Sequence, residues 1–571
     1  MEERRIQMIE KRADLASGRT GTVDRVWWGT LCGVVIGCMI AAWSNRDNLN
    51  TDAIAYAQIA RHWVEGRWDL AVSGYWGPLL SWLMAPLMYG GMPPLLAARE
   101  VMALSAVLFW LGASGVLRGA GLRRRSVLCS EGILAVCSIA WAGQNISPDL
   151  LLSALSLFAV ARLWSAAWLN QWRCQAACGL GWGGAYLAKA IGLPMAVVTI
   201  TAAAVARWVL VRRGFCVFGA DAKASSARTV FSAWLRTLGV MGLVSLPWIL
   251  ALSFHYGYPT FSTSGRIAHA VVGPADVDRY HPFARVFHTP AAGRITSWED
   301  PSGMDYRYWS PMESAVYRSH QIGLIKQNAE TAVGLLGSFD SVGVGALALF
   351  GAVVSLGFRM RRSGGNRPIL LWELAWIPVV CLTVLYLPVY LSWFDQRYFF
   401  FALPFMLAAC FGGLERFGEQ TGTGLAATPI PSWVGVAQGV LFLVFLAPNL
   451  RPMALVLDGA PDPASSYARD MATRLKGLGI PGSVAGSAIV AGGRTGIYIA
   501  YLMDRPWLGD RIKPTADEIA NSGAALMVLT RRDALQAELN RDPRFEDLDG
   551  NLFKSPRDAE NYALKVYKVR P

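Results

Sequence analysis

Apolar residues fall into long runs along most of the chain, and short polar connections separate the runs. A helix needs roughly 20 mostly apolar residues to cross about 30 Å of hydrocarbon. About eleven runs suit such a helix. Their apolar centres lie at 26–43, 101–117, 127–141, 150–161, 179–193, 195–211, 238–254, 331–356, 370–391, 398–413 and 434–447. The pattern predicts a polytopic α-helical membrane protein with about 11 transmembrane helices.

The basic residues of the connections indicate an orientation, because cationic segments are translocated poorly and cytoplasmic loops are rich in Lys and Arg. With residues 1–25 as a cytoplasmic arm, the inner connections contain Arg118, Arg123, Arg124, Arg125, Arg173, Arg212, Arg213, Lys223, Arg228, Arg359, Arg361, Arg362 and Arg367. The connections 44–99 and 255–330 and the chain after about residue 448 then lie outside. We expect a multi-pass protein of the bacterial inner membrane whose outer parts face the periplasm.

Composition supports this interpretation, since 53% of the residues are hydrophobic, 16% are charged, and the mean hydropathy is +0.33. The net charge of +13 comes largely from residues that border the spans, which argues against a nucleic-acid-binding protein. All nine cysteines fall in predicted spans or inner loops. The outer segments are therefore expected to fold without disulfides.

The chain after about residue 461 has the composition of a small soluble domain. Its pattern predicts helices at 467–478, 515–520 and 533–539, strands at 483–491, 524–530 and 562–569, and a further element at 497–503. Thr515 and Glu518 have the spacing of a capping box. We predict three parts: the arm 1–25, a membrane module 26–448 with outer loops 44–99 and 255–330, and an extracytoplasmic α/β domain 461–571.

The first outer loop begins with an apolar pattern typical of an amphipathic helix lying along the membrane interface. Its apolar positions are Ala53, Tyr56, Ala57, Ile59, Ala60, Trp63 and Val64. Asp52 stands at the start of this helix, where a carboxylate near the helix N-terminus is worth about 0.3 to 1 kcal/mol. Its position fits that structural role and the role of a general base equally well.

The second outer loop holds five of the six histidines: His255, His269, His281, His288 and His320. A connection of this length in a compact protein is usually functional or a lid. No histidine pair has the spacing of a zinc site, so surface or substrate contacts are favoured over metal ligation. A divalent metal cofactor stays open. The aromatic residues between Trp298 and Tyr317 suit sugar stacking and interfacial anchoring equally well.

Three polar residues stand at the outer ends of later spans. Asp149 begins a predicted helix, where it either neutralises the helix N-terminus or contacts substrate. Lys189 lies in an apolar run, and a lysine there is costly unless it snorkels or meets an anion; we favour the anion. Arg397 offers a planar donor fork that suits phosphate, with a surface pair to Asp395 as the alternative.

Five local patterns share the outer side and a fixed order along residues 26–415. They are Asp52 with Tyr56, Ala57, Ala60 and Gly66; Trp76-Gly77-Pro78-Leu79-Leu80 with Trp82 and Leu83; Ser147-Pro148-Asp149-Leu150-Leu151; Leu187-Ala188-Lys189-Ala190; and Arg397-Tyr398 with Leu403-Pro404. Together they resemble the polytopic GT-C glycosyltransferases that use polyprenyl-phosphate sugars, particularly bacterial relatives of the protein O-mannosyltransferases and lipid A aminoarabinose transferases. Two positions depart from the family: Ala53 replaces a frequent second acidic residue, and Trp76 replaces a lysine of some relatives.

The resemblance implies transfer of a sugar from a polyprenyl-phosphate donor to a lipid, glycan or protein acceptor. Asp52 is then the general base on the acceptor hydroxyl, and Arg397 and Lys189 balance the phosphate charge. Asp149 positions the acceptor or the sugar, while Tyr56 and Tyr398 orient their neighbours. A single displacement inverts the anomeric centre. Ala53 weakens the case for a metal site built from two carboxylates.

Two other classes of function remain open at this point. A transporter or flippase of a polyprenyl-linked or other anionic lipid would also use Lys189 and Arg397, but no internal inverted repeat favours it. An assembly scaffold would use the outer domain 461–571 to capture a partner. The scaffold explains the polar residues of the outer side least well.

Overall fold

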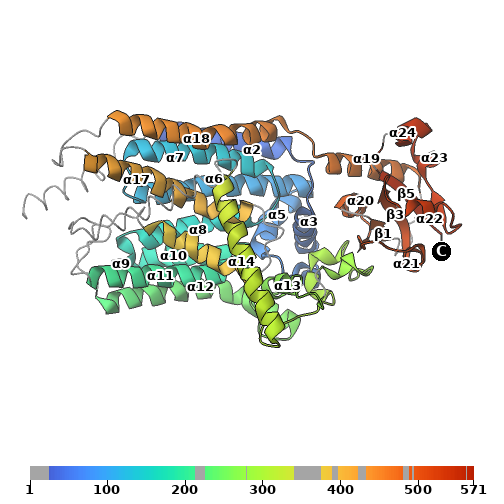
Figure 1. Ribbon diagram of the computed structural model, residues 1–571, viewed down its shortest axis with the longest axis horizontal. Helices are drawn as coiled ribbons and strands as arrows, with labels where there is room; N and C mark the ends of the chain where they lie inside the picture. Colours follow the sequence, from blue (N-terminus) through green and yellow to red (C-terminus); the bar gives the residue numbers. More distant parts are fainter. Residues whose placement is uncertain are drawn as a thin grey trace, which may run out of the picture.

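The computed structural model describes residues 25–212, 226–277, 280–339, 374–388, 396–421, 432–479, 488–491, 494–560, 562 and 564–570. Long helices lie side by side in a bundle, and a mixed α/β domain stands at one end of it (Figure 1). Within the described ranges, seven helical segments are long and apolar enough to cross a membrane. The chain is a polytopic α-helical membrane protein with a C-terminal α/β region, as predicted.

The bundle places α6 between α2, α7 and α8. Its helices are α2 (Arg25–Ser44), α6 (Pro94–Gly119), α7 (Arg124–Gly143), α8 (Asp149–Trp164), α9 (Ala167–Asn170), α10 (Trp172–Ala188), α11 (Gly192–Arg212), α12 (Ala227–Tyr256), α16 (Trp376–Tyr386), α17 (Leu403–Thr421) and α18 (Ser432–Asp458). Small residues allow close approach: a Cβ on Gly179 of α10 would lie 2.6 Å from the Thr237 carbonyl oxygen of α12.

Two predicted spans differ from the observed helices. The span 179–193 is broken, because α10 ends at Ala188, Lys189 has an extended backbone (φ −155°, ψ 133°) and α11 begins at Gly192. The first residues of the predicted span 331–356 belong to a helix that begins much earlier, α14 (Ala315–Ser338), so the second outer loop ends in a helix. The rest of that span and parts of 370–391 lie outside the described residues.

The first outer loop forms α3 (Thr51–Val64), α4 (Trp68–Ala71) and α5 (Pro78–Tyr89). Figure 1 shows α3 crossing the end of the bundle where the α/β domain stands. The helix predicted at the start of this loop is present, but its polar positions are not set apart on an exposed face, since every residue from Ala53 to Ala60 is buried. The reason is tertiary: α5, α6, the second outer loop and α20 pack around α3.

The second outer loop contains α13 (Ser264–Ala270), η2 (Pro282–Ala284), η3 (Ser297–Glu299), η4 (Pro301–Gly303) and the start of α14. It is joined to α3 by His62 Nε2, which lies 2.9 Å from Glu299 Oε2 with both side chains fully buried. It is also joined to the α/β domain, because the Trp507 amide donates to the Ile295 carbonyl at 2.7 Å. The loop therefore links the two outer parts of the molecule.

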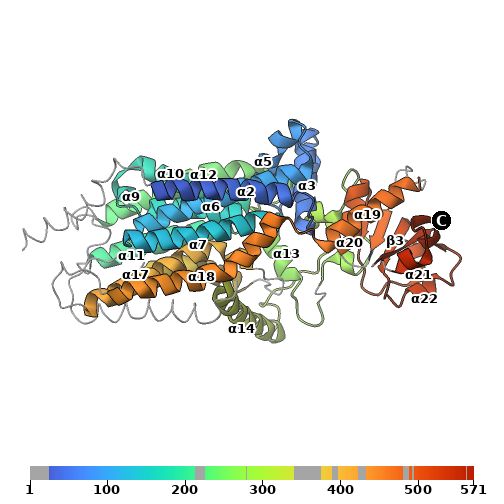
Figure 2. The ribbon, with the colours of Figure 1, turned by 90° about the horizontal axis from the view of Figure 1, so that it is seen from above.

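The α/β domain consists of α19 (Pro463–Gly477), β1 (Ala488–Ala491), α20 (Arg494–Met503), β2 (Trp507–Gly509), α21 (Ala516–Ala520), β3 (Ala524–Thr530), α22 (Gln536–Leu539), β4 (Phe545–Asp547), α23 (Asp549–Leu552), α24 (Pro556–Glu560) and β5 (Leu564–Val569). The sheet order is β2-β1-β3-β5-β4, with β1, β2 and β3 parallel and β5 antiparallel to its neighbours. Figure 2 shows α19 and α20 between the bundle and the rest of this domain.

The predicted elements of this domain agree with the observed ones to differing degrees. The predicted strand 524–530 coincides with β3, and the predicted capping box of Thr515 and Glu518 is present. The predicted strand 483–491 overlaps β1, although its first residues lie outside the described ones. The sequence pattern missed β2 and β4, which have three residues each and no alternation to reveal them.

Candidate functional site

Four charged side chains from separate parts of the chain meet at the end of the bundle that α3 crosses. We call Asp52, Asp149, Lys189 and Arg397 the charged cluster. Arg397 Nη1 lies 3.1 Å from Asp52 Oδ2, and Arg397 Nε lies 3.7 Å from Asp149 Oδ2. Lys189 Nζ lies 2.5 Å from Asp149 Oδ1. One arginine thus bridges two carboxylates, and a lysine holds the second carboxylate from its other oxygen.

Local structure explains how each residue reaches the charged cluster. Asp52 and Asp149 lie in the first turns of α3 and α8, where free backbone N–H groups favour a carboxylate. Lys189 occupies the break between α10 and α11, where the backbone is extended rather than helical. Arg397 belongs to the 3₁₀ helix η7 (Gln396–Ala402) that precedes α17. The predicted alternative partner of Arg397, Asp395, lies outside the described residues.

Burial differs among the four side chains. Asp149 is 2% exposed, whereas Asp52, Arg397 and Lys189 are 16%, 17% and 25% exposed. The two carboxylates balance the two cations, so the charged cluster is neutral as it stands. An anion arriving from the open side meets both cations and competes with the carboxylates for them.

Aromatic rings border the charged cluster. Lys189 Nζ lies 4.0 Å from the ring centre of Tyr398, and the guanidinium carbon of Arg397 lies 5.4 Å from the same ring. The Tyr56 ring packs on Trp76 at 5.1 Å. Burial, with the negative charges of Asp52 and Asp149, raises the pKa of Tyr56 well above its usual value. The Tyr56 phenol therefore keeps its proton and can donate a hydrogen bond.

Sequence reasoning missed Tyr75, whose ring packs on Trp76 as that of Tyr56 does. Its ring lies 4.7 Å from Trp76 and 5.2 Å from Trp298 of the second outer loop. Burial raises the pKa of Tyr75, and the negative charge of Asp52 acts in the same direction. The signal in the sequence was the position of Tyr75 beside the Trp-Gly-Pro pattern, but interfacial aromatic residues have the same pattern.

The loop histidines do not gather at one site. His281 Nδ1 lies 2.7 Å from Tyr306 Oη, and His288 Nδ1 lies 2.7 Å from Ser297 Oγ. His269 contacts Gln321, and His320 contacts the Val272 carbonyl. In the parts of the chain that the structure covers, no three His, Cys, Asp or Glu side chains are placed to hold a metal ion. The question of a divalent metal cofactor, which the sequence leaves open, stays open.

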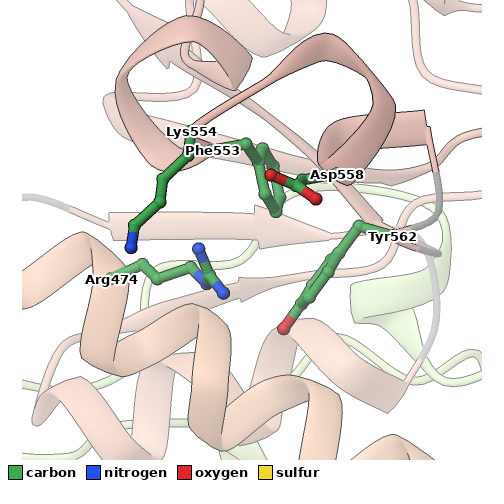
Figure 3. A pocket seen from close by; sticks show the side chains of 5 residues that line it. All are labelled: Arg474, Phe553, Lys554, Asp558 and Tyr562. Carbon is green, nitrogen blue, oxygen red and sulfur yellow. The ribbon is translucent and has the colours of Figure 1, made fainter.

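A separate hollow of about 380 Å³ lies on the α/β domain. Its lining residues are Arg474, Phe553, Lys554, Asp558 and Tyr562. Figure 3 shows Arg474 and Lys554 on one side of the hollow and Tyr562 on the other. Arg474 is already held by Asp470 at 2.8 Å and by the Leu552 carbonyl at 2.9 Å. None of these residues reaches the charged cluster, so the hollow is not part of the candidate site.

The sequence matches no protein-family model and no curated protein. The structure is similar to ArnT from Cupriavidus metallidurans bound to undecaprenyl phosphate, with a TM-score of 0.52 and 13% identity over 95% of this chain and 98% of that one. The apo state of ArnT gives a TM-score of 0.53. The archaeal oligosaccharyltransferase AglB from Archaeoglobus fulgidus, in complex with an inhibitory peptide and a dolichol-phosphate, gives a TM-score of 0.52 and 11% identity over 89% of this chain and 70% of that one.

The chain has the GT-C fold. This similarity confirms, for the fold, the resemblance that the five local patterns predict. It extends over the whole bundle and the α/β domain rather than over residues 26–415 alone. At 11–13% identity a GT-C fold does not assign individual residues, so the roles within the charged cluster depend on its own geometry.

Proposed function

We propose that this protein is a membrane glycosyltransferase that moves a sugar from a polyprenyl-phosphate donor to an acceptor hydroxyl on the outer face of a bacterial inner membrane. The charged cluster carries this proposal. In it a partly exposed carboxylate, Asp52, contacts Arg397, and Asp149 connects Arg397 to the second cation, Lys189, at the end of the bundle where the α/β domain stands. The GT-C fold supports it, since glycosyl transfer from lipid carriers occurs on this fold.

The chemistry matches these groups. The acceptor oxygen forms a bond to the anomeric carbon of the sugar, the bond from that carbon to the phosphate oxygen breaks, and the acceptor proton passes to Asp52. The polyprenyl phosphate leaves as a stabilised anion and needs little acid assistance. The protein must therefore orient the acceptor, accept its proton and balance the phosphate charge.

Each residue of the charged cluster has a role in this scheme. The donor phosphate binds Arg397 and Lys189. Asp52 Oδ2 lies 3.1 Å from Arg397 before the donor binds, loses this contact when it binds, and then faces the acceptor. Asp149 keeps Lys189 in place and positions the acceptor or the sugar. Tyr56 and Tyr398 orient their neighbours, Tyr56 as a neutral donor and Tyr398 through its ring. A single displacement inverts the anomeric centre, and a product with retained configuration would overturn this step.

The test compares Asp52→Asn with Asp47→Asn in the full chain. Asp47 lies in the same connection but is 60% exposed and pairs with Arg469, so it is a matched control. A panel of radiolabelled polyprenyl-phosphate monosaccharides serves as donor, and membrane extract serves as the source of acceptor. Loss of a general base removes roughly 10²- to 10⁴-fold of the rate. We expect such a loss for Asp52→Asn and wild-type transfer for Asp47→Asn.

A second readout separates the enzyme from a transporter. Binding of undecaprenyl monophosphate by Asp52→Asn should persist, because Arg397 and Lys189 remain. Absence of transfer from every donor in the wild-type protein, together with movement of labelled lipid across vesicles, would replace the proposal with a flippase. A chelator added to the transfer assay tests whether transfer depends on a divalent metal.

A further inference from the structure

We propose that Arg99 and Asn50 form one clamp that positions the two carboxylates of the charged cluster. This inference rests on the proposed function, because it concerns the rate of the same reaction. Neither residue touches the site. They act on the two chain segments that lead into Asp52 and Asp149, and they are therefore positioning residues rather than catalytic ones.

Arg99 of α6 is 1% exposed and reaches both segments at once. Its Nη1 donates to the carbonyls of Gly143 at 3.0 Å and Gln144 at 2.5 Å, which end α7 just before the turn into α8. Its Nη2 donates to the Asn48 carbonyl at 2.9 Å, in the segment that leads into α3. A single guanidinium thus joins the end of α7 to the beginning of α3.

Asn50 completes the connection from the other side. Its side-chain amide nitrogen donates to the Ile146 carbonyl at 3.0 Å, and its side-chain oxygen accepts from the Ile146 amide at 3.1 Å. Asn50 is the residue before α3, and Ile146 lies three positions before Asp149. Each clamp contact therefore lies within a few residues of a site carboxylate.

The chain packs closely at Gly143, beside the contacts of Arg99. A Cβ on Gly143 would lie 2.1 Å from Val456 Cγ1 and 2.9 Å from Asn45 Nδ2. The end of α7 is thus pressed against α18 and against the segment that leads into α3. The glycine permits this close approach, and Arg99 fixes it with hydrogen bonds.

The cost of burying the Arg99 cation indicates that this residue has a role. Among the residues that the structure describes, Arg99 forms no ion pair with a carboxylate and contacts only carbonyl oxygens, and a buried cation without such a partner is costly. An ionisable group inside a membrane bundle is by default a functional candidate. Its three acceptors all belong to the segments that carry the two site carboxylates.

The clamp has a reason in the reaction. Before donor binding, Arg397 attracts both Asp52 and Asp149 and holds them together. When a phosphate takes Arg397, the two carboxylates lose their shared cation and repel each other. The contacts of Arg99 and Asn50 go to neutral backbone groups, so they keep the carboxylates in place when the charges of the cluster are redistributed.

The test is a double-mutant cycle in the full chain with Arg99→Lys, Asn50→Ala and their combination. Lysine keeps the charge but cannot join two segments with one planar fork. We expect kcat to fall roughly tenfold or more in each single variant, because small displacements of reacting groups have large effects on rate. Affinity for undecaprenyl monophosphate should change less than about threefold, since Arg397 and Lys189 remain. The double variant should lose little more than the worse single variant.

Arg207→Lys is the matched control. Arg207 is a buried arginine of α11 and donates to the carbonyls of Leu163 and Ser165, at the opposite end of α8 from Asp149. Its combination with Asn50→Ala should multiply the single effects. Losses of kcat that multiply for Arg99 and Asn50, or an unchanged kcat in both single variants, would overturn the clamp.

The unfolding temperature gives a readout that does not depend on transfer. Shifts of the unfolding midpoint in the same cycle should also fall short of the sum, because the two residues support one contact. If the wild-type protein transfers no sugar from any donor, the proposed function fails while this readout still decides whether the clamp exists. Additive midpoint shifts would then overturn it.

Discussion

The carboxylates at the two ends of the bundle have different kinds of partners. At the end remote from α3, Glu131 accepts from Ser114 Oγ at 2.5 Å and from Arg118 Nε at 2.9 Å. Glu415 at the same end accepts from Ser126 Oγ at 2.6 Å and from the Arg123 amide at 3.1 Å. At the α3 end, Asp52 and Asp149 instead share Arg397 over 3.1 and 3.7 Å.

The difference separates a structural arrangement from one prepared for a ligand. Each remote carboxylate has a serine hydroxyl donor from a neighbouring helix, together with Arg118 for Glu131 or the Arg123 amide for Glu415, and they join α6 to α7 and α7 to α17. The cations of the charged cluster are partly exposed, and an incoming phosphate can take them from their carboxylates. Changes in the charged cluster should therefore affect function, whereas changes at the remote end should affect stability.

The largest expected effect concerns Arg397→Lys. Lysine keeps the charge but loses the planar fork that meets two groups at once, and we expect transfer to fall roughly a hundredfold because a group that stabilises developing charge is displaced. Affinity for undecaprenyl monophosphate should fall roughly tenfold, by the loss of one charge-assisted hydrogen bond. Binding is measured by titration of the purified protein, with Arg46→Lys as the exposed control. Unchanged affinity would remove Arg397 from the phosphate site.

The next effect concerns Glu415→Gln at the remote end. The amide group turns an acceptor into a donor facing Ser126 Oγ or the Arg123 amide, and we expect a loss of about 1–3 kcal/mol of stability from the unsatisfied buried groups. The kcat of the folded protein should not change. Thermal unfolding and transfer are measured on the same sample, with the exposed Glu313→Gln as control. A fall in kcat without a fall in the unfolding midpoint would contradict the comparison.

The smallest effect concerns pH and the outer loop that lies between the two outer parts. Burial lowers the pKa of His281 to about 4, below the ordinary value near 6.5 that applies when the chain unfolds. The unfolded chain therefore binds the proton more tightly. Stability from the neutral imidazole is complete above pH 6.5 and declines as the pH falls from 6.5 towards 4. His281→Gln should make the unfolding midpoint less sensitive to acid.

Asp510 contributes a pH dependence of stability opposite in sign to that of His281, over nearly the same pH range. Burial raises the pKa of Asp510 to about 6 from an ordinary value near 3.8, so the folded protein binds this proton more tightly and gains stability as the pH falls from 6 towards 3.8. Asp510→Asn should therefore make the midpoint more sensitive to acid. Unfolding curves between about pH 4 and 7.5 test both signs. If His281→Gln and Asp510→Asn change the acid sensitivity of the unfolding midpoint in the same direction, this assignment is contradicted.

Local patterns determined most of the secondary structure. Long apolar runs predicted the membrane helices, because crossing hydrocarbon requires every backbone group to be paired within the helix. A short apolar run and a capping box predicted β3 and α21 for equally local reasons. The break at Lys189, the burial of α3 and the short strands β2 and β4 could not be predicted, since each depends on neighbours distant in sequence.

The sequence by itself also nominated the members of the charged cluster, because charged side chains at the ends of apolar spans are costly and rare. It did not show that Lys189 pairs with Asp149, nor that one arginine bridges Asp52 and Asp149. It gave no sign of Arg99, whose importance lies in joining the segments of Asn48 and Gln144, each about fifty residues from Arg99 on opposite sides along the chain. Residue types follow from local chemistry, whereas charge pairing and positioning arise only when the folded helices bring distant segments together.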